Sequence, residues 1–98
     1  MKYYHATSED SLSKILAEGV IKTGFDGIVY LAETQENALR FVALRLLDQP
    51  VIVLEIDIPD ESKLIETFDH SYKFFKCKSF GYLENISSNH ITAIWKYS

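Results

Sequence analysis

The chain has 98 residues, of which 47% are hydrophobic, and this composition predicts one small globular domain over residues 1–98. Its net charge is −4, and it lacks the basic excess of proteins that follow a phosphate backbone, so we expect no long nucleic acid as a partner. With Cys77 as the single cysteine and no apolar run of membrane-spanning length, we expect a cytoplasmic protein without a disulfide or a membrane contact.

The first predicted elements are a strand, a helix and a glycine stop. Residues 2–6 predict the strand, and Thr7 or Ser8 is suited to cap the helix that follows. The apolar face of this helix has helical spacing and consists of Leu12, Ile15 and Leu16. Gly19 can take the left-handed conformation that ends a helix. His5 therefore lies where the strand passes into the helix, and there a polar side chain and helix N–H groups can face one ligand.

The middle of the chain predicts a strand, a helix and a second strand. A turn-rich loop over residues 22–27 leads to the apolar run 28–32, which predicts a short buried strand. Thr34 is a good N-cap for a helix from residue 35 to about residue 47. The segment 51–58 opens with four consecutive apolar residues and then alternates, which is typical of a central strand with one wet face at its end.

The last third predicts strands alone. Their ranges are 63–68, 78–83 and 90–97, with turns at 59–62 and 85–89. On the last strand, one face is expected to hold Ile91, Ala93, Trp95 and Tyr97. Because the helices come early and the strands late, the order predicts an α+β domain and not a doubly wound sheet.

Few patterns in the sequence carry chemistry. No two of the three histidines (His5, His70 and His90) have the short spacing typical of metal ligands, so we expect no metal site and no prosthetic group. Lysines flank Cys77, which favours a reactive thiolate, but a small buried residue on a strand is the commoner use of such a cysteine. No nucleophile elbow, phosphate-binding loop or dinucleotide glycine motif is present.

Two segments in the first half of the chain nevertheless resemble one superfamily. Tyr4-His5-Ala6-Thr7-Ser8, followed by Leu12, Ile15, Leu16, Gly19 and Val20, resembles the opening strand and helix of ADP-ribosyltransferase folds. Gly27-Ile28-Val29-Tyr30-Leu31-Ala32-Glu33, followed by Asn37-Ala38, is similar to a strand and helix of the poly-ADP-ribose polymerase and RNA 2′-phosphotransferase branches. The two segments occur in the order and at the compact spacing of that superfamily.

The resemblance implies a compact α+β fold with a mixed, mainly antiparallel sheet and two helices in the N-terminal half. It implies that His5 hydrogen-bonds the adenosine ribose of NAD or a related nucleotide, with Thr7 beside it. It also implies that Tyr30 stacks on the nicotinamide or an equivalent ring. The residues alone leave two other roles open, a histidine at a strand end and a tyrosine in the core. In the late polar segment 69–71, His70 is either a residue that closes over the ligand or part of a solvated turn.

The resemblance is less complete where catalysis is concerned. Catalytic members use a Glu on a late strand to contact the reacting ribose. The turn 86–91 is similar to the turn that follows that strand in the family, but it lacks the family's proline. Counting back from Ile86 by the family's usual interval between Glu and turn leads to Ser79 or Phe80, neither of which is an acid. Glu84 is the nearest acid, and it can serve only if the strand register differs.

Three classes of function follow. The first is a non-catalytic protein that binds or sequesters an NAD-like, ADP-ribose-like or cyclic nucleotide, for example in phage counter-defence, where it would act in the host cytoplasm. The alternative is an active ADP-ribosyltransferase or NAD glycohydrolase of the toxin or effector type that uses Glu84. The third is a protein-interaction module, or a homo-oligomer, in which the last strand pairs with a partner at the edge of the sheet.

Overall fold

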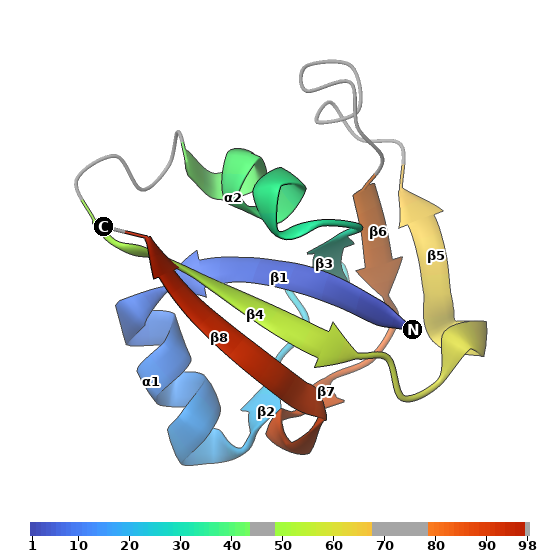
Figure 1. Cartoon of the computed structure of the whole chain (residues 1–98). Helices are drawn as coiled ribbons and strands as arrows, with labels where there is room; N and C mark the ends of the chain where they lie inside the picture. The colour runs from blue at the N-terminus through green and yellow to red at the C-terminus, as the bar shows by residue number, and fades with distance from the viewer. Residues whose placement is uncertain (44–48, 68–78, 98) are drawn as a thin grey trace.

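The computed structural model describes residues 1–43, 49–67 and 79–97, and its centre is a six-stranded sheet in the order β5-β6-β3-β1-β4-β8 (Figure 1). The strands are β1 (Lys2–Ser8), β3 (Val29–Ala32), β4 (Val51–Asp57), β5 (Leu64–Thr67), β6 (Ser79–Tyr82) and β8 (Ile91–Tyr97). A small second sheet pairs β2 (Val20–Ile21) with β7 (Ile86–Ser87). The helices are α1 (Glu9–Glu18) and α2 (Gln35–Ala43), with short 3-10 helices η1 (Glu61–Lys63) and η2 (Ser88–His90).

This architecture confirms a compact α+β fold with a mainly antiparallel sheet and two helices in the N-terminal half. Every strand pair in the described part of the chain is antiparallel, so the parallel pairing of a mixed sheet is not seen there. Neither of the two described α-helices is long and apolar enough to cross a membrane.

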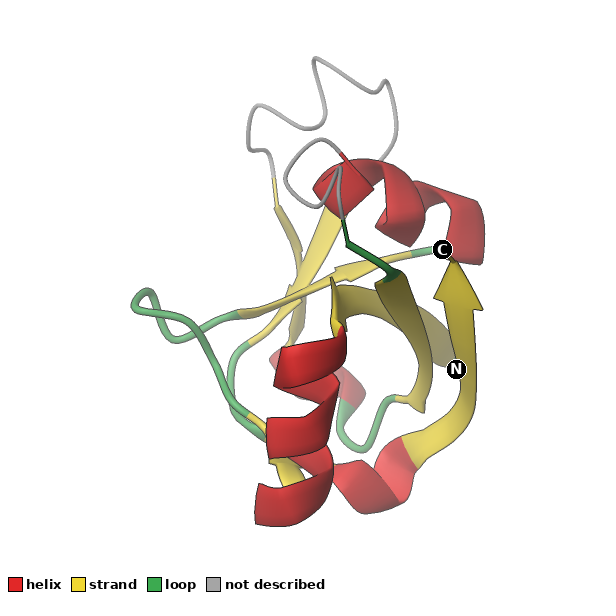
Figure 2. Ribbon diagram, turned by 90° about the vertical axis from the view of Figure 1, so that its left-hand side faces the viewer, coloured by secondary structure: helices red, strands yellow, loops and turns green. Residues whose placement is uncertain are grey.

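Both faces of the sheet are covered, and each has its own apolar cluster. Helix α2 packs on β1, β3 and β4, and there the smaller core buries Ala32, Ala38, Val51 and Val53. Helix α1 lies on the other face of the sheet, where it contacts β1, β4 and the short strand β2. Figure 1 shows the two helices apart, on either side of β1. Figure 2 shows the same separation from the side. The sheet is therefore the middle layer of the molecule.

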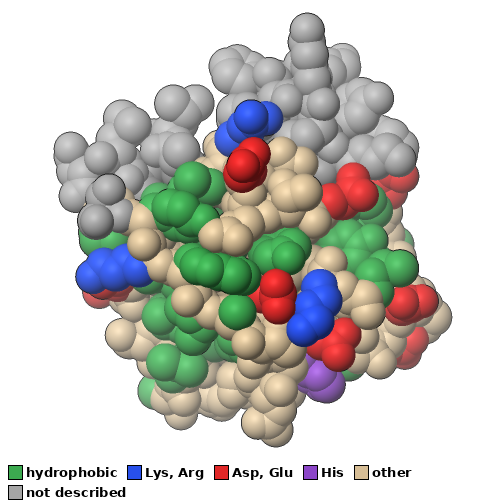
Figure 3. Space-filling view, in the orientation of Figure 1, with side chains coloured by type: hydrophobic (Ala, Val, Ile, Leu, Met, Phe, Trp, Pro, Cys, Tyr) green, Lys and Arg blue, Asp and Glu red, His purple; other side chains and the backbone are tan. Residues whose placement is uncertain are grey.

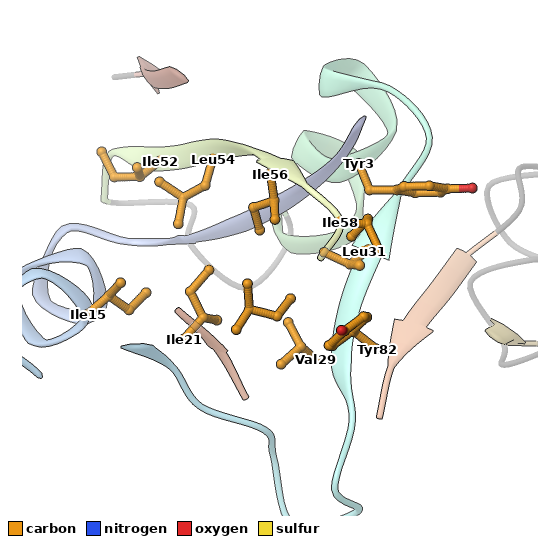
Figure 4. Close-up of a cluster of buried hydrophobic side chains, with 11 residues drawn as sticks. Tyr3, Ile15, Ile21, Val29, Leu31, Ile52, Leu54, Ile56, Ile58 and Tyr82 are labelled. Atoms are coloured by element: carbon orange, nitrogen blue, oxygen red, sulfur yellow. The ribbon is translucent and has the colours of Figure 1, made fainter. Parts of the chain in front are cut away.

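The larger core fills the face opposite α2. It contains Tyr3, Ile15, Ile21, Val29, Leu31, Ile52, Leu54, Ile56, Ile58, Tyr82 and Ile86. Figure 4 shows Ile15 of α1 and Ile21 of β2 facing strand β4. Alternate residues of β4 enter the two cores, which explains its run of consecutive apolar residues. Each fully buried Leu or Ile side chain stabilises the fold by about 1.5–3 kcal/mol relative to exposure.

Helix α1 begins and ends as its sequence predicts. The Ser8 Oγ accepts a hydrogen bond from the Ser11 backbone N–H at 3.1 Å, which identifies Ser8 as the N-cap. Gly19 adopts φ 75°, and its N–H donates to the Ile15 carbonyl at 2.8 Å. The predicted cap of α2 is also confirmed, because the Thr34 Oγ1 accepts from the Asn37 N–H at 3.1 Å.

The last strand differs from its prediction because of a β-bulge. Glu55 pairs with Ala93 but Ile56 pairs with Ile91, so Thr92 is an extra residue in β8. One inserted residue reverses the face of everything before it. Ile91 therefore packs against the larger core, whereas Trp95 and Tyr97 pack against the smaller one. The prediction that these three residues share one face is wrong for Ile91.

The predicted turn at 85–89 is likewise only partly correct. It contains β7 and the start of η2. Ile86 is buried in the larger core, where β7 pairs with β2. Two residues of strand are too short to show a periodic pattern in the sequence.

Gly81 of β6 offers a test of this packing. A Cβ at Gly81 would lie 2.5 Å from the Ile28 Cγ2, which belongs to a branched and therefore stiff side chain. We expect Gly81→Ala to lower the free energy of unfolding by about 1–3 kcal/mol in urea denaturation. Gly24→Ala is the matched control, since the nearest contact of its new Cβ is an ordinary 3.5 Å. Equal stability of the two variants would contradict this packing.

Candidate functional site

A cleft of about 210 Å³ opens between β1, α1 and β2. Strand β1 contributes alternate residues, which point to the same face of the sheet. Helix α1 contributes positions i, i+3, i+4 and i+7, which share one side of a helix. The lining residues are His5, Thr7, Ser11, Lys14, Ile15, Glu18, Val20, Ile21 and Lys22. His5 and Thr7, which the sequence singled out, are thus brought together in one cleft.

His5 is held where the ladder between β1 and β3 stops. These two strands pair only at Tyr4 and Ala32, whereas β1 pairs with β4 along its whole length. The His5 Nδ1 lies 2.8 Å from the Tyr30 carbonyl oxygen. The imidazole therefore bridges the two strands beyond their last backbone pair.

This contact fixes the tautomer of His5. A carbonyl oxygen can only accept a hydrogen bond, so Nδ1 must carry the proton and donate it. Burial lowers the pKa of His5, which favours the neutral ring, although the Tyr30 carbonyl acts in the opposite direction. In the neutral ring Nε2 is an acceptor, and it forms no hydrogen bond with any residue that the structure describes. His5 can therefore accept a hydrogen bond from a ligand hydroxyl.

One cation of the cleft is left for a ligand. The Lys22 Nζ lies 2.6 Å from the Oε2 of Glu18, the last residue of α1. The two charges of this ion pair cancel. Lys14 makes no ion pair of 4.0 Å or less within the described ranges. On the face drawn in Figure 3, Lys and Arg side chains lie beside Asp or Glu side chains.

Tyr30 meets His5 through its backbone and not through its ring. Val29 and Leu31 enter the larger core and Ala32 the smaller one, so alternation places the Tyr30 ring on the α2 side of the sheet. The ring is 41% exposed and does not line the cleft. Its hydroxyl donates to the Asp26 carboxylate, which lowers the pKa of Asp26. The predicted stacking role of Tyr30 would require a ligand that reaches beyond the cleft.

The cleft lies along the side of α1 and not at its N-terminus. Ser8 caps the first turn, and Glu9 and Asp10 place negative charge there. The Glu9 Oε1 lies 2.5 Å from the Lys96 Nζ of β8. The helix N–H groups that the sequence analysis placed beside His5 are therefore poorly suited to an anion.

Of the remaining predicted site residues, the structure describes Glu84, and it does not line this cleft. Glu84 follows β6, and its Oε2 lies 2.5 Å from the Lys63 Nζ, away from the lining residues. His70 and Cys77 lie outside the described residues. Within the described ranges, no group of three or more His, Cys, Asp or Glu side chains could hold a metal ion.

Sequence reasoning missed four polar residues of the cleft, Ser11, Lys14, Glu18 and Lys22. A signal was present, because Ser11 and Lys14 flank the apolar Ile15 at helical spacing on the helix that follows His5. That spacing places them on one side of α1, but only the crossing of α1 over β1 shows that this side faces His5.

Comparison with known proteins adds the fold and no function. No protein-family model matches the chain, and no curated protein matches it. The crystal structure of protein CC0527 from Caulobacter crescentus is similar, with a TM-score of 0.74 at 14% identity over 98% of this chain and 85% of that chain. A double mutant of CC0527 gives a TM-score of 0.73 with the same coverage. At this identity the similarity shows the fold alone.

The lowered pKa of His5 makes stability depend on pH in one direction. As the pH falls through about 6.5, the unfolded chain takes up a proton on this residue before the folded chain does. We therefore expect the contribution of His5 to the free energy of unfolding to decrease between pH 7.5 and pH 5. In His5→Asn, an amide N–H replaces the Nδ1 donor without a titratable group. Urea denaturation of both proteins across this range isolates the contribution. A difference that does not change with pH, or that changes in favour of the wild type at low pH, would contradict it.

Proposed function

We propose that this chain binds a small nucleotide, NAD-like, ADP-ribose-like or cyclic, in the cleft between β1, α1 and β2, and releases it unchanged. One observation carries the proposal: the Tyr30 carbonyl holds His5 with Nε2 as an acceptor, in a cleft that also contains Lys14, which makes no ion pair with the residues that the structure describes. A ribose hydroxyl can donate to Nε2, and a phosphate can accept from the ammonium of Lys14. The hydroxyl of Thr7 lies on the same face of β1 for a second contact with the sugar.

Binding without turnover is favoured over catalysis because the cleft has no suitable acid. Glu18 is its single carboxylate, and it is paired with Lys22. Glu84, on which the transferase or glycohydrolase alternative depends, is paired with Lys63 and is not a lining residue. A protein that holds a nucleotide without cleaving it suits a sequestering role, such as removal of a host nucleotide signal by a phage-encoded protein.

Two substitutions of His5 separate the ligand contact from the contact with Tyr30. His5→Asn keeps a donor near the Nδ1 position and removes the Nε2 acceptor, whereas His5→Gln keeps a polar group near Nε2 and loses that donor. We expect His5→Asn to weaken nucleotide binding about tenfold in isothermal titration calorimetry, as expected for one lost hydrogen bond. Unchanged affinity in both variants, for NAD, ADP-ribose and a cyclic nucleotide alike, would contradict the cleft as the binding site.

Recovery of the ligand tests the absence of turnover. After incubation with NAD and heat denaturation of the protein, we expect chromatography to return the nucleotide intact. We also expect Glu84→Gln to bind as the wild type does, because its carboxylate contacts Lys63 outside the cleft. Cleavage by the wild type that is lost in Glu84→Gln would establish the enzymatic alternative instead.

A further inference from the structure

We infer that this cleft prefers a nucleotide with one negatively charged phosphodiester, such as a 3′,5′-cyclic mononucleotide, over nucleotides with a terminal phosphate or a pyrophosphate. This inference rests on the proposed function and names the ligand class of the same site. Two properties of the cleft carry it, its charge and its size.

The charge of the cleft matches one phosphate charge. Lys14 and Lys22 are its cations and Glu18 is its anion, so with His5 neutral the lining has one surplus positive charge. Lys14 provides that charge because Glu18 is bound to Lys22, and Asp10, its other helical neighbour, is not within ion-pair distance. A second phosphate charge would meet the Glu18 carboxylate without a cation of its own, and two like charges at close range repel.

The size of the cleft disfavours a pyrophosphate nucleotide, whereas its charge is what separates a cyclic mononucleotide from one with a terminal phosphate. Its volume of about 210 Å³ is below the range of about 300–1,000 Å³ that is usual for pockets of drug-sized ligands. One ribose with one phosphate is therefore the part of a nucleotide that the cleft can hold. In a 3′,5′-cyclic mononucleotide the ribose keeps its 2′-hydroxyl, which can donate to the His5 Nε2 while the phosphodiester contacts Lys14.

Calorimetry with matched probes tests this preference. At pH 7.5 we compare 3′,5′-cyclic AMP, which has one negative charge, with 5′-AMP and ADP-ribose, which have two. We expect the cyclic nucleotide to bind about tenfold more tightly than either, and its 2′-deoxy analogue to lose most of this advantage. Tighter binding of 5′-AMP or ADP-ribose would overturn the charge preference and leave the proposed function standing. No binding of any probe at millimolar concentration would overturn both.

Two variants show whether the surplus charge causes the preference. Glu18→Gln removes a negative charge and frees Lys22, which gives the lining two surplus positive charges, so we expect the affinity for 5′-AMP and ADP-ribose to rise toward that for cyclic AMP. Lys14→Gln should weaken cyclic AMP binding about tenfold. Lys2→Gln, which changes the net charge equally, contacts Glu55 from another part of β1 and should leave binding unchanged. If the preference survives in Glu18→Gln, or if Lys2→Gln has the effect of Lys14→Gln, the charge of the cleft does not cause it.

Discussion

The unequal pairing of strand β1 is the constraint on which the candidate site depends. On one side β1 forms a ladder with β4 from Lys2 to Ser8, whereas on the other side it pairs with β3 only at Tyr4. Beyond that single pair, the His5 Nδ1 donates a hydrogen bond to the Tyr30 carbonyl oxygen at 2.8 Å and so joins β1 to β3 through a side chain. This hydrogen bond between β1 and β3 also fixes which nitrogen of His5 is available to a ligand. The contact of His5 with Tyr30 and the proposed contact with a ligand therefore use the two different nitrogens of its ring.

Both layers around the sheet contain an apolar core, and the candidate cleft lies in the layer of α1 and β2. Both cores use β4, whose residues alternate between α2 and the layer of α1 and β2. In that second layer, Ile15 contributes to the larger core and also lines the cleft. The polar residues on either side of Ile15 then face His5 because they share its side of the helix. The cleft is therefore a consequence of how α1 packs, and the ion pair of Glu18 with Lys22 leaves Lys14 as its surplus cation.

Much of the fold follows from local chemistry in the sequence. The Ser8 cap, the Gly19 stop and the apolar run of β4 each reflect a backbone or burial requirement at one position, and each is observed. The β-bulge at Thr92 could not be predicted, because an inserted residue leaves the apparent alternation of β8 intact while it reverses the face of Ile91. The site was predicted in part. His5 and Thr7 meet in one cleft, but Lys14 and the position of the Tyr30 ring depend on tertiary packing. The role of Glu84 stays a prediction that its ion pair with Lys63 does not favour.

The most direct measurement is a long-range ¹H–¹⁵N NMR spectrum of the His5 ring, with and without nucleotide. We predict that Nδ1 carries the proton in the free protein, because it donates to the Tyr30 carbonyl. Addition of 3′,5′-cyclic AMP is predicted to shift the Nε2 resonance as it accepts a hydrogen bond, while Nδ1 keeps its proton. A protonated Nε2 in the free protein, or an Nε2 resonance that does not move at saturating nucleotide, would contradict the assignment of this cleft as the binding site.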